Sequence, residues 1–266
     1  MQIKEITSTQ NTLVKQILML RDKSRERKKT SLFIIEGQRE LMQASKANYT
    51  VQTLLFCPDL IAMETLKTMI SEGMECIQIS KSVFEKIAYR SSTEGIIAIA
   101  EMKRHHLEDL KFHNKNPLVL VAEAPEKPGN IGALLRTADA ANVDAMIIAN
   151  PKSDLYNPNI IRSSVGCVFT NQVALGDSKT IIEFLKEHNI SIYSAILQEA
   201  KNYHEQDFTS STAIVVGTEA EGLSESWRTA ATQNIQIPMQ GEIDSMNVSV
   251  AAGILIFEVK RQRNFK

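Results

Sequence analysis

The chain has 266 residues, which is enough for one large domain or two modest ones. Its 43% hydrophobic and 23% charged residues are typical of a folded soluble protein, and a formal net charge of −1 gives no global signature of nucleic-acid binding. The three cysteines include no C-x-x-C pair and the histidines show no metal-ligand spacing, which argues against a disulfide framework or a metal site. No apolar run resembles a signal peptide or spans a bilayer, so we expect a cytoplasmic protein.

The first 30 residues are basic, with eight Lys and Arg against three acidic residues. A helical pattern at 12–20 leads into a run whose cationic side chains are Arg25, Arg27, Lys28 and Lys29. Basic arms can bind phosphates, although charge alone favours a solvated helix face. Contact between these four side chains and RNA is therefore a hypothesis that needs support from the rest of the chain.

Short strands and helices alternate through the first hundred residues, which predicts a small α/β domain. Strands are expected at 32–35, 51–56, 76–79 and 95–100, and helices at 37–47, 61–72 and 81–88. The stretch 106–116 is polar with charges of both signs, and it predicts a linker. The expected organisation is a first domain at 1–105, this linker, and a second domain at 117–266.

The second domain has the pattern of a mostly parallel sheet with helices on both faces. Strands are expected at 118–121, 145–149, 172–175, 190–196, 213–217 and 234–237. Helices are expected at 131–141, 178–188, 223–231 and 247–262. Ligands of such sheets bind at the carboxyl ends of the strands, so the segments that follow the strands are the candidates for chemistry.

The first such segment is 126–138 (EKPGNIGALLRTA). Asn130 is a candidate N-cap for the helix that follows. Arg136 points away from the sheet-facing side, where it could bind a phosphate, although a solvated arginine is the more common occurrence. The glycines give G-x-x-G without the third glycine of a dinucleotide fingerprint, so a dinucleotide site is poorly supported.

The second segment is 217–224 (GTEAEGLS), an acidic turn bounded by glycines. Glu219 and Glu221 would repel a phosphate, so the turn suits a hydroxyl-rich or cationic ligand. A turn whose acids lie near a helix N-terminus is an equally good interpretation. In the third segment, Ser245 and Asn247 precede the last helix, and capping is the favoured interpretation for both. That helix is strongly apolar, and we expect it to be buried.

Taken together, these segments resemble the three motifs of the SpoU/TrmH family of RNA ribose methyltransferases, which belongs to the knotted SPOUT class. The matching stretches are 130–138 (NIGALLRTA), 217–224 (GTEAEGLS), 237–239 (IPM) and 245–251 (SMNVSVA). The resemblance covers essentially all of residues 117–266. It implies a deep trefoil knot in the parallel sheet, which no periodicity could predict.

The resemblance also implies S-adenosylmethionine as the cofactor, bound in the knot loops and lined by Gly217, Ile237 and Met246. The family usually has leucine at position 246, and methionine is a volume-matched replacement. The implied polar catalytic site consists of Asn130, Arg136, Glu219, Ser245 and Asn247. In the first domain, 33–37 (FIIEG) and 93–96 (TEGI) resemble the family's RNA-binding accessory domain more weakly, which implies RNA capture.

The leading hypothesis is an enzyme that methylates ribose 2′-hydroxyls of ribosomal RNA. Transfer RNA is the second candidate substrate. A catalytically silent RNA-binding or ribosome-assembly factor is an alternative of another class, and the intact polar set argues against it. A small-molecule methyltransferase is disfavoured by the basic arm and the accessory domain. The last helix is apolar on more than one face, and together with the resemblance this predicts a homodimer.

Overall fold

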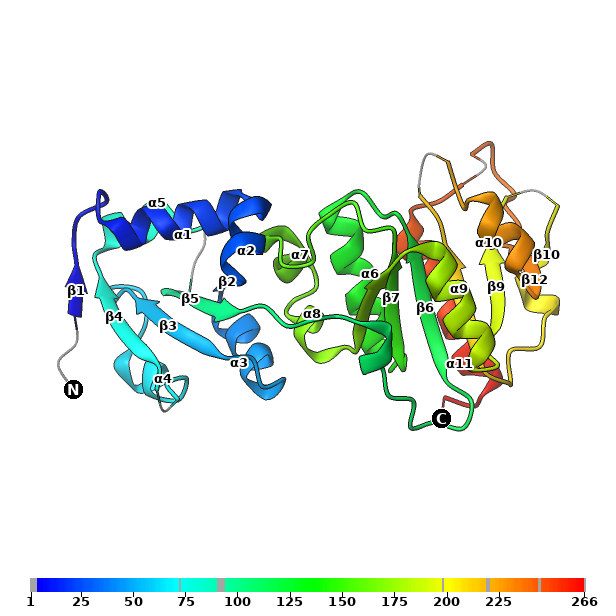
Figure 1. Ribbon diagram of the computed structural model, residues 1–266, viewed down its shortest axis with the longest axis horizontal. Helices are drawn as coiled ribbons and strands as arrows, with labels where there is room; N and C mark the ends of the chain where they lie inside the picture. Colours follow the sequence, from blue (N-terminus) through cyan, green and yellow to red (C-terminus); the bar gives the residue numbers. More distant parts are fainter. Residues whose placement is uncertain are drawn as a thin grey trace. The chain divides into compact units, whose positions relative to one another are not determined.

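A computed structural model describes residues 4–71, 73–89, 94–197, 199–218, 221–243 and 245–265. The chain forms two compact units (Figure 1). The first comprises Met1–Arg104 together with Asp154–Thr170, and the second comprises His105–Ser153 together with Asn171–Lys266. The segment 154–170 therefore belongs to the first unit although it lies within the sequence of the second, which the sequence did not predict.

The first unit contains a five-stranded mixed sheet in the order β1-β4-β3-β5-β2. Its strands are β1 (Lys4–Ile6), β2 (Leu32–Glu36), β3 (Val51–Phe56), β4 (Glu75–Ile79) and β5 (Ile96–Glu101). Its helices from the first hundred residues are α1 (Thr12–Asp22), α2 (Ser24–Thr30), α3 (Gln38–Lys46), α4 (Met63–Lys67) and α5 (Lys81–Ile87). The predicted strands are confirmed, the helix expected at 61–72 is much shorter, and edge strand β1 was not predicted.

The segment 154–170 completes the core of the first unit. Its helices α7 (Pro158–Ser163) and α8 (Cys167–Thr170) pack against β2 and α3, respectively. The centroid of the Tyr156 ring lies 4.3 Å from the centroid of the Phe33 ring. The Tyr156 hydroxyl is 3.2 Å from the hydroxyl of Tyr49. Both Tyr156 and Phe33 are almost fully buried, so this segment covers apolar surface that residues 1–104 would otherwise expose.

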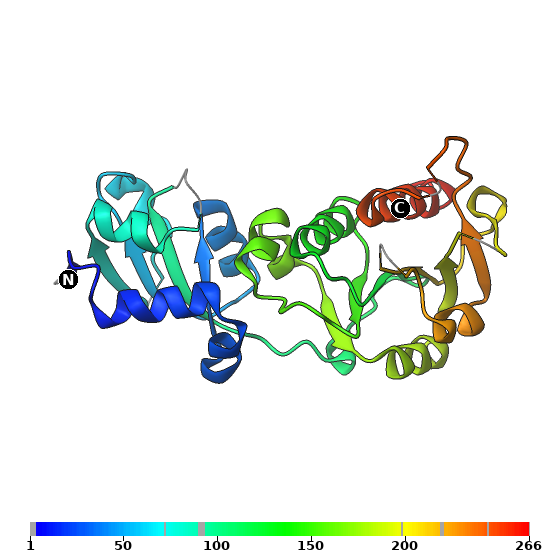
Figure 2. The same ribbon diagram turned by 90° about the horizontal axis from the view of Figure 1, so that it is seen from above.

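The second unit contains a seven-stranded sheet in the order β10-β12-β9-β11-β6-β7-β8, and its strand pairs are parallel. Its strands are β6 (Leu118–Glu123), β7 (Ala145–Ala149), β8 (Val173–Gly176), β9 (Ser191–Ala195), β10 (Lys201–Asn202), β11 (Thr212–Val216) and β12 (Gln233–Gln236). Its helices are α6 (Pro128–Ala140), α9 (Ser178–Glu187), α10 (Glu225–Ala230) and α11 (Val248–Gln262), with 3₁₀ turns at Leu107–Asp109 and Tyr203–Glu205. Figure 2 shows α6 and α11 on one face of the sheet, and α9 and α10 on the other. The predicted α/β class and parallel sheet are confirmed.

Two expectations about the second unit are wrong. The stretch 106–116 is not a free linker, because Leu107 is buried in the core of this unit and Phe112 packs against the same core. The last helix is not buried all round: its inner face is buried, but Val250 is 53% exposed and Phe257 42% exposed. Those two apolar side chains, seven residues apart, lie on one side of α11.

Neither a membrane-spanning helix nor a metal cluster is evident in the described part of the chain. No helix there has both the length and the apolarity to cross a membrane. Within the same residues, no group of three or more His, Cys, Asp or Glu side chains could hold a metal ion. The cysteines Cys57, Cys76 and Cys167 are free and buried.

Candidate cofactor and RNA-binding site

A cavity of about 860 Å³ opens at the carboxyl ends of three neighbouring strands in the second unit. Ala195, Val216 and Gln236 stand at the ends of β9, β11 and β12 and contribute to its wall. Its size lies within the range of about 300–1,000 Å³ that is usual for ligand pockets. Its position agrees with the rule that ligands of open parallel sheets bind beyond the carboxyl ends of the strands.

The cavity brings together residues that are distant in the sequence. Gly217 follows β11, Ile237 follows β12, and Met246 precedes α11, and all three line the same cavity. Ser245 and Asn247 line it as well. The structure therefore gathers at one place the three residues expected to line the cofactor and two of the five expected to form the polar site.

Asn130 lies beside this group. Its side-chain oxygen accepts a hydrogen bond from the Asn247 amide at 3.3 Å, although 117 positions separate the two residues. Asn130 lines a smaller cavity of about 240 Å³, whose wall shares Lys127, Gly217 and Thr218 with the larger one. The two cavities are therefore neighbours, with Asn130 on the side of the smaller one.

The capping predictions are only partly correct. Asn247 is the N-cap of α11 and accepts a hydrogen bond from the Ser249 main-chain N–H at 2.9 Å. Ser245 is not the cap of that helix. Asn130 is not a cap either, because α6 begins at Pro128, which can occupy a first helical position, and Asn130 lies within the first turn. The Asn130 side chain does not cap α6, and its oxygen accepts the hydrogen bond from Asn247.

The turn after β11 folds back on itself. Thr218 and Gly222 exchange two main-chain hydrogen bonds of 3.1 Å, and the Glu221 N–H donates to the Thr218 hydroxyl. A Cβ at Gly217 would collide with the main chain of Gly222 and Leu223. Glycine is thus required for the turn itself, and a Gly217→Val variant would distort the turn before any ligand arrives.

One described member of the predicted polar site, Arg136, stands apart from this group. Arg136 is exposed on α6, and it lines neither cavity in the described structure. Its guanidinium makes no hydrogen bond or ion pair with a described residue, so it is available to an external ligand. Glu219 lies outside the described residues.

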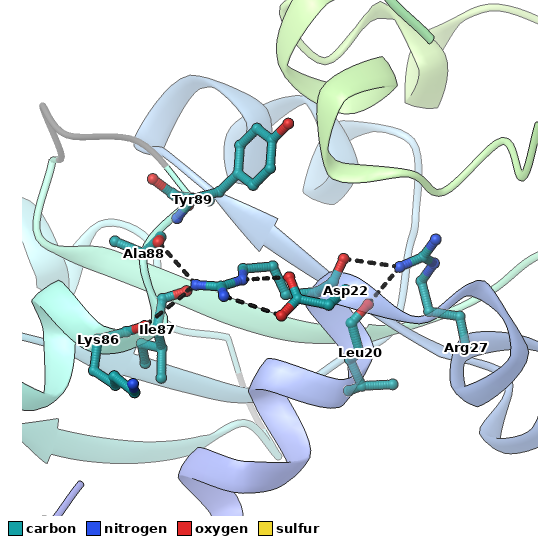
Figure 3. A network of polar contacts seen from close by, with 9 residues as sticks. Leu20, Asp22, Arg27, Lys86, Ile87, Ala88 and Tyr89 are labelled. Carbon is teal, nitrogen blue, oxygen red and sulfur yellow. Dashed lines mark hydrogen bonds and ion pairs between the residues drawn. The ribbon is translucent and has the colours of Figure 1, made fainter. Parts of the chain in front are cut away.

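The basic arm is the stretch 1–30, and the cationic side chains of its central run are of two kinds. Arg25, Lys28 and Lys29 are exposed. Arg27 is 2% exposed, donates to the carbonyl of Leu20 (Figure 3), and pairs with Asp154 at 2.5 Å. The prediction that Arg27 contacts phosphate is therefore wrong, because its guanidinium is already committed inside the protein.

Arg21 has a structural role as well. Its guanidinium donates to the carbonyls of Lys86, Ile87 and Ala88 at the end of α5 (Figure 3). It also forms two hydrogen bonds with the Asp22 carboxylate, and these lower the pKa of Asp22. Two of the arm's eight cations therefore stabilise the fold, and the exposed remainder can bind a partner.

Sequence reasoning missed one buried polar residue of the second unit. Glu123 is the last residue of β6 and only 5% exposed, and it accepts hydrogen bonds from the segment that follows the cavity turn. The only available signal was a carboxylate directly after the apolar run LVLVA, which resembles an ordinary strand end.

Comparison with known proteins identifies the family. Residues 117–257 match the SpoU rRNA Methylase family, and residues 11–98 match the MRM3-like substrate binding domain. The first match covers more than half of the chain, so the chain belongs to the SpoU methylase family. The resemblance inferred from the three motifs is confirmed.

Three similar proteins span nearly the whole chain. One is the Bacillus subtilis protein named 23S rRNA (guanosine(2553)-2′-O)-methyltransferase RlmP, 30% identical over 97% of this chain and 100% of its own. A crystal structure of an RNA 2′-O ribose methyltransferase superposes with a TM-score of 0.85 at 35% identity, covering 98% of this chain and 99% of that one. An AdoMet-bound rRNA methyltransferase from Sinorhizobium meliloti superposes with a TM-score of 0.88 at 25% identity, covering 97% and 98%.

Proposed function

We propose that this protein is an S-adenosylmethionine-dependent methyltransferase that acts on a ribose 2′-hydroxyl of ribosomal RNA. The observation that carries the proposal is the convergence of Gly217, Ile237 and Met246 on one cavity, beside the pair formed by Asn130 and Asn247. The similar proteins support both the cofactor and the substrate class, since one is named for 23S rRNA and another was solved with AdoMet.

The larger cavity has the chemistry that the cofactor requires. Ile196, Val216 and Ile237 offer apolar cover for an adenine ring, and Gln236 and Asn247 offer polar groups for the ribose and the amino-acid end. When bound, S-adenosylmethionine supplies an electrophilic methyl group on sulfonium sulfur. Its methyl group would pass from the sulfur to the 2′-oxygen, and the hydroxyl proton would leave to an acceptor.

The smaller cavity is the place we assign to the target ribose. It adjoins the cofactor cavity through Gly217 and Thr218, and Asn130 and Lys127 give it polar walls. Asn130, Ser245 and Asn247 orient the reacting groups, and the proton passes to an RNA phosphate oxygen or to Glu219. We further propose the family's trefoil knot in the second unit and a cytoplasmic location, where ribosomal RNA would meet the enzyme.

Calorimetry with S-adenosylmethionine and with RNA, together with a methyl-transfer assay, separates this function from its alternatives. The enzyme is expected to bind S-adenosylmethionine without RNA and to transfer methyl groups to ribosomal RNA. A catalytically silent assembly factor would bind RNA without methylating it, and a small-molecule methyltransferase would bind the cofactor but not RNA. Preferential methyl transfer to transfer RNA would show that transfer RNA, and not ribosomal RNA, is the substrate. The proposed chemistry would be unchanged.

The exposed cations of the basic arm are proposed to bind RNA phosphates. Replacing Arg25, Lys28 and Lys29 by glutamine should weaken RNA binding and lower the slope of log K against log salt by about two, because each contact releases counterions. The slope is measured by fluorescence anisotropy across a salt series. A matched control removes three exposed lysines of the second unit: Lys179, Lys186 and Lys201. An unchanged slope in the arm variant, or an equal fall in the control, would place the RNA surface elsewhere.

The exposed apolar side of α11 supports a homodimer. Val250 and Phe257 lie on this side with half-buried Ile254 between them, and α11 packs beside α6. Replacing Val250 and Phe257 by glutamate should give a monomer, because charges would have to be buried in the interface. Light scattering at micromolar concentration measures the mass, and Met42→Glu, an exposed apolar position in the first unit, should leave it unchanged. A monomeric wild-type protein would contradict the proposal.

A further inference from the structure

A buried carboxylate lies at the end of β6, an interior strand of the parallel sheet. Glu123 Oε1 accepts hydrogen bonds from the hydroxyls of Ser178 at 3.0 Å and Ser224 at 2.7 Å. Its Oε2 accepts one from the Ser224 main-chain N–H at 2.8 Å. A charged group with 5% exposure is costly to bury, and these three donors offset that cost.

The donors come from segments on both sides of β6. Ser178 begins α9, and its hydroxyl oxygen accepts hydrogen bonds from the Trp227 indole at 2.9 Å and from the Asn150 amide at 2.8 Å. Trp227 lies in α10 and is fully buried. The carboxylate is thus the common acceptor for the starts of α9 and α10, and α10 is attached to it directly through Ser224 and indirectly through Trp227.

Ser224 is used in an unusual way. It is the N-cap of α10, where a serine hydroxyl normally accepts a hydrogen bond from the helix, yet it makes no such side-chain bond. Its hydroxyl instead donates to Glu123. The local interaction that stabilises a helix start is therefore replaced by one that ties the end of the turn to a different strand.

This attachment fixes the turn that forms one wall of the larger cavity. Gly217, Thr218, Gly222 and Leu223 line the cavity and end directly at Ser224. The start of the turn is held by β11, and its middle is closed by the exchange between Thr218 and Gly222. Apart from the contacts of Ser224, the far end of the turn is held by the burial of Leu223 and by the hydrogen bond from the Arg228 guanidinium to the Leu223 carbonyl.

We infer that Glu123 is a positioning residue for cofactor binding, which holds the 221–224 end of the turn after β11 in its binding conformation through Ser224. The inference rests on the proposed assignment of the larger cavity to S-adenosylmethionine. Glu123 itself is not among the residues that line the cavity. Its effect should therefore fall on cofactor affinity, and the chemical step should proceed normally once the cofactor is bound.

The test uses the full-length protein and titration calorimetry with S-adenosylmethionine. Glu123→Ala should raise the Kd for S-adenosylmethionine at least about tenfold. Ser224→Ala should raise it only about threefold, because residue 224 keeps its main-chain hydrogen bond to Glu123. In both variants the KM for the cofactor should rise while kcat at saturating cofactor stays within about twofold. Thr212→Val is the matched control: it removes a buried hydroxyl bond, to the Ser210 carbonyl, at the opposite end of β11, and it should leave the Kd unchanged.

A fourth variant tests the assigned cavity independently. Ala251 lines the larger cavity, so the ring of Ala251→Phe should project into it and obstruct binding. Normal binding by Ala251→Phe would overturn the cofactor placement. If that variant fails to bind and Glu123→Ala binds like wild type, the positioning role alone is overturned. An equal loss of affinity in Thr212→Val would also overturn it. Should Glu123→Ala not fold, Ser224→Ala decides: weaker binding supports the inference and unchanged binding overturns it.

Discussion

Replacing Arg136 by alanine should lower the single-turnover rate of methyl transfer by about 10²–10³-fold, the effect of removing one transition-state charge stabiliser. Its guanidinium is exposed on α6 and unpaired among the described residues. A guanidinium stays protonated at neutral pH and is therefore a poor base. We therefore assign it to the RNA phosphate beside the target ribose, where it stabilises negative charge developing on the 2′-oxygen.

The lysine variant tests the geometry of this assignment. Arg136→Lys should not restore the normal rate, because a point charge cannot reproduce the planar, two-pronged contact of arginine. Cofactor affinity should survive in both variants, since Arg136 does not line the larger cavity. Arg261→Ala, at the end of α11 remote from the cavity, is the control for loss of an exposed arginine. Near-normal transfer by Arg136→Ala would refute the catalytic role, and full rescue by lysine would refute the geometric part.

Replacing Asp154 by asparagine should destabilise the first unit by about 3–5 kcal/mol, because it leaves the Arg27 cation buried without a counter-charge. The Arg27 and Asp154 side chains are 3% and 6% exposed. Asparagine preserves the side-chain oxygen that accepts from the Tyr156 N–H. Adding Arg27→Met to Asp154→Asn should recover much of the loss, since neither charge is then buried alone. Urea unfolding followed by far-UV circular dichroism measures the change, and Trp227 fluorescence reports the second unit separately.

An exposed ion pair in the same unit provides the control. Asp22 is 49% exposed and pairs with Arg21, so Asp22→Asn should cost no more than about 1 kcal/mol. A fragment of residues 1–105 lacks Asp154, Tyr156 and the helices α7 and α8, and it should be less stable than the first unit in the full chain. Equal stability of Asp154→Asn and wild type, or a fragment as stable as the intact unit, would contradict the role assigned to this segment.

Local patterns were sufficient to predict most of the regular structure. The apolar run at 190–196 and the helical pattern at 247–262 correspond to β9 and α11 within one residue at each end. Apolar runs and 3.6-residue periodicity are properties of neighbouring residues, so a single sequence contains them. The motif resemblance supplied what periodicity could not, namely that Gly217, Ile237 and Met246 would meet at one cavity.

Contacts between distant residues were beyond such patterns. Arg27 and Asp154 are 127 positions apart, and nothing near either residue indicates that they pair. A basic run predicts solvated side chains, so the burial of Arg27 reverses its expected role. Glu123 was missed for the same reason, because its importance depends on Ser224, which is 101 positions away. The start of α6 was misplaced because Pro128 can begin a helix, whereas Asn130 resembled its cap.

Mapping ribose methylation in ribosomal and transfer RNA by mass spectrometry, in cells with and without the gene, would test the proposed methyltransferase activity in its natural setting. One 2′-O-methylated nucleotide of ribosomal RNA should disappear in the deletion strain. It should return with the wild-type gene and fail to return with the Arg136→Ala variant. Unchanged ribose methylation of ribosomal RNA in the deletion strain, or loss of a methyl group from a base, would contradict the proposed function.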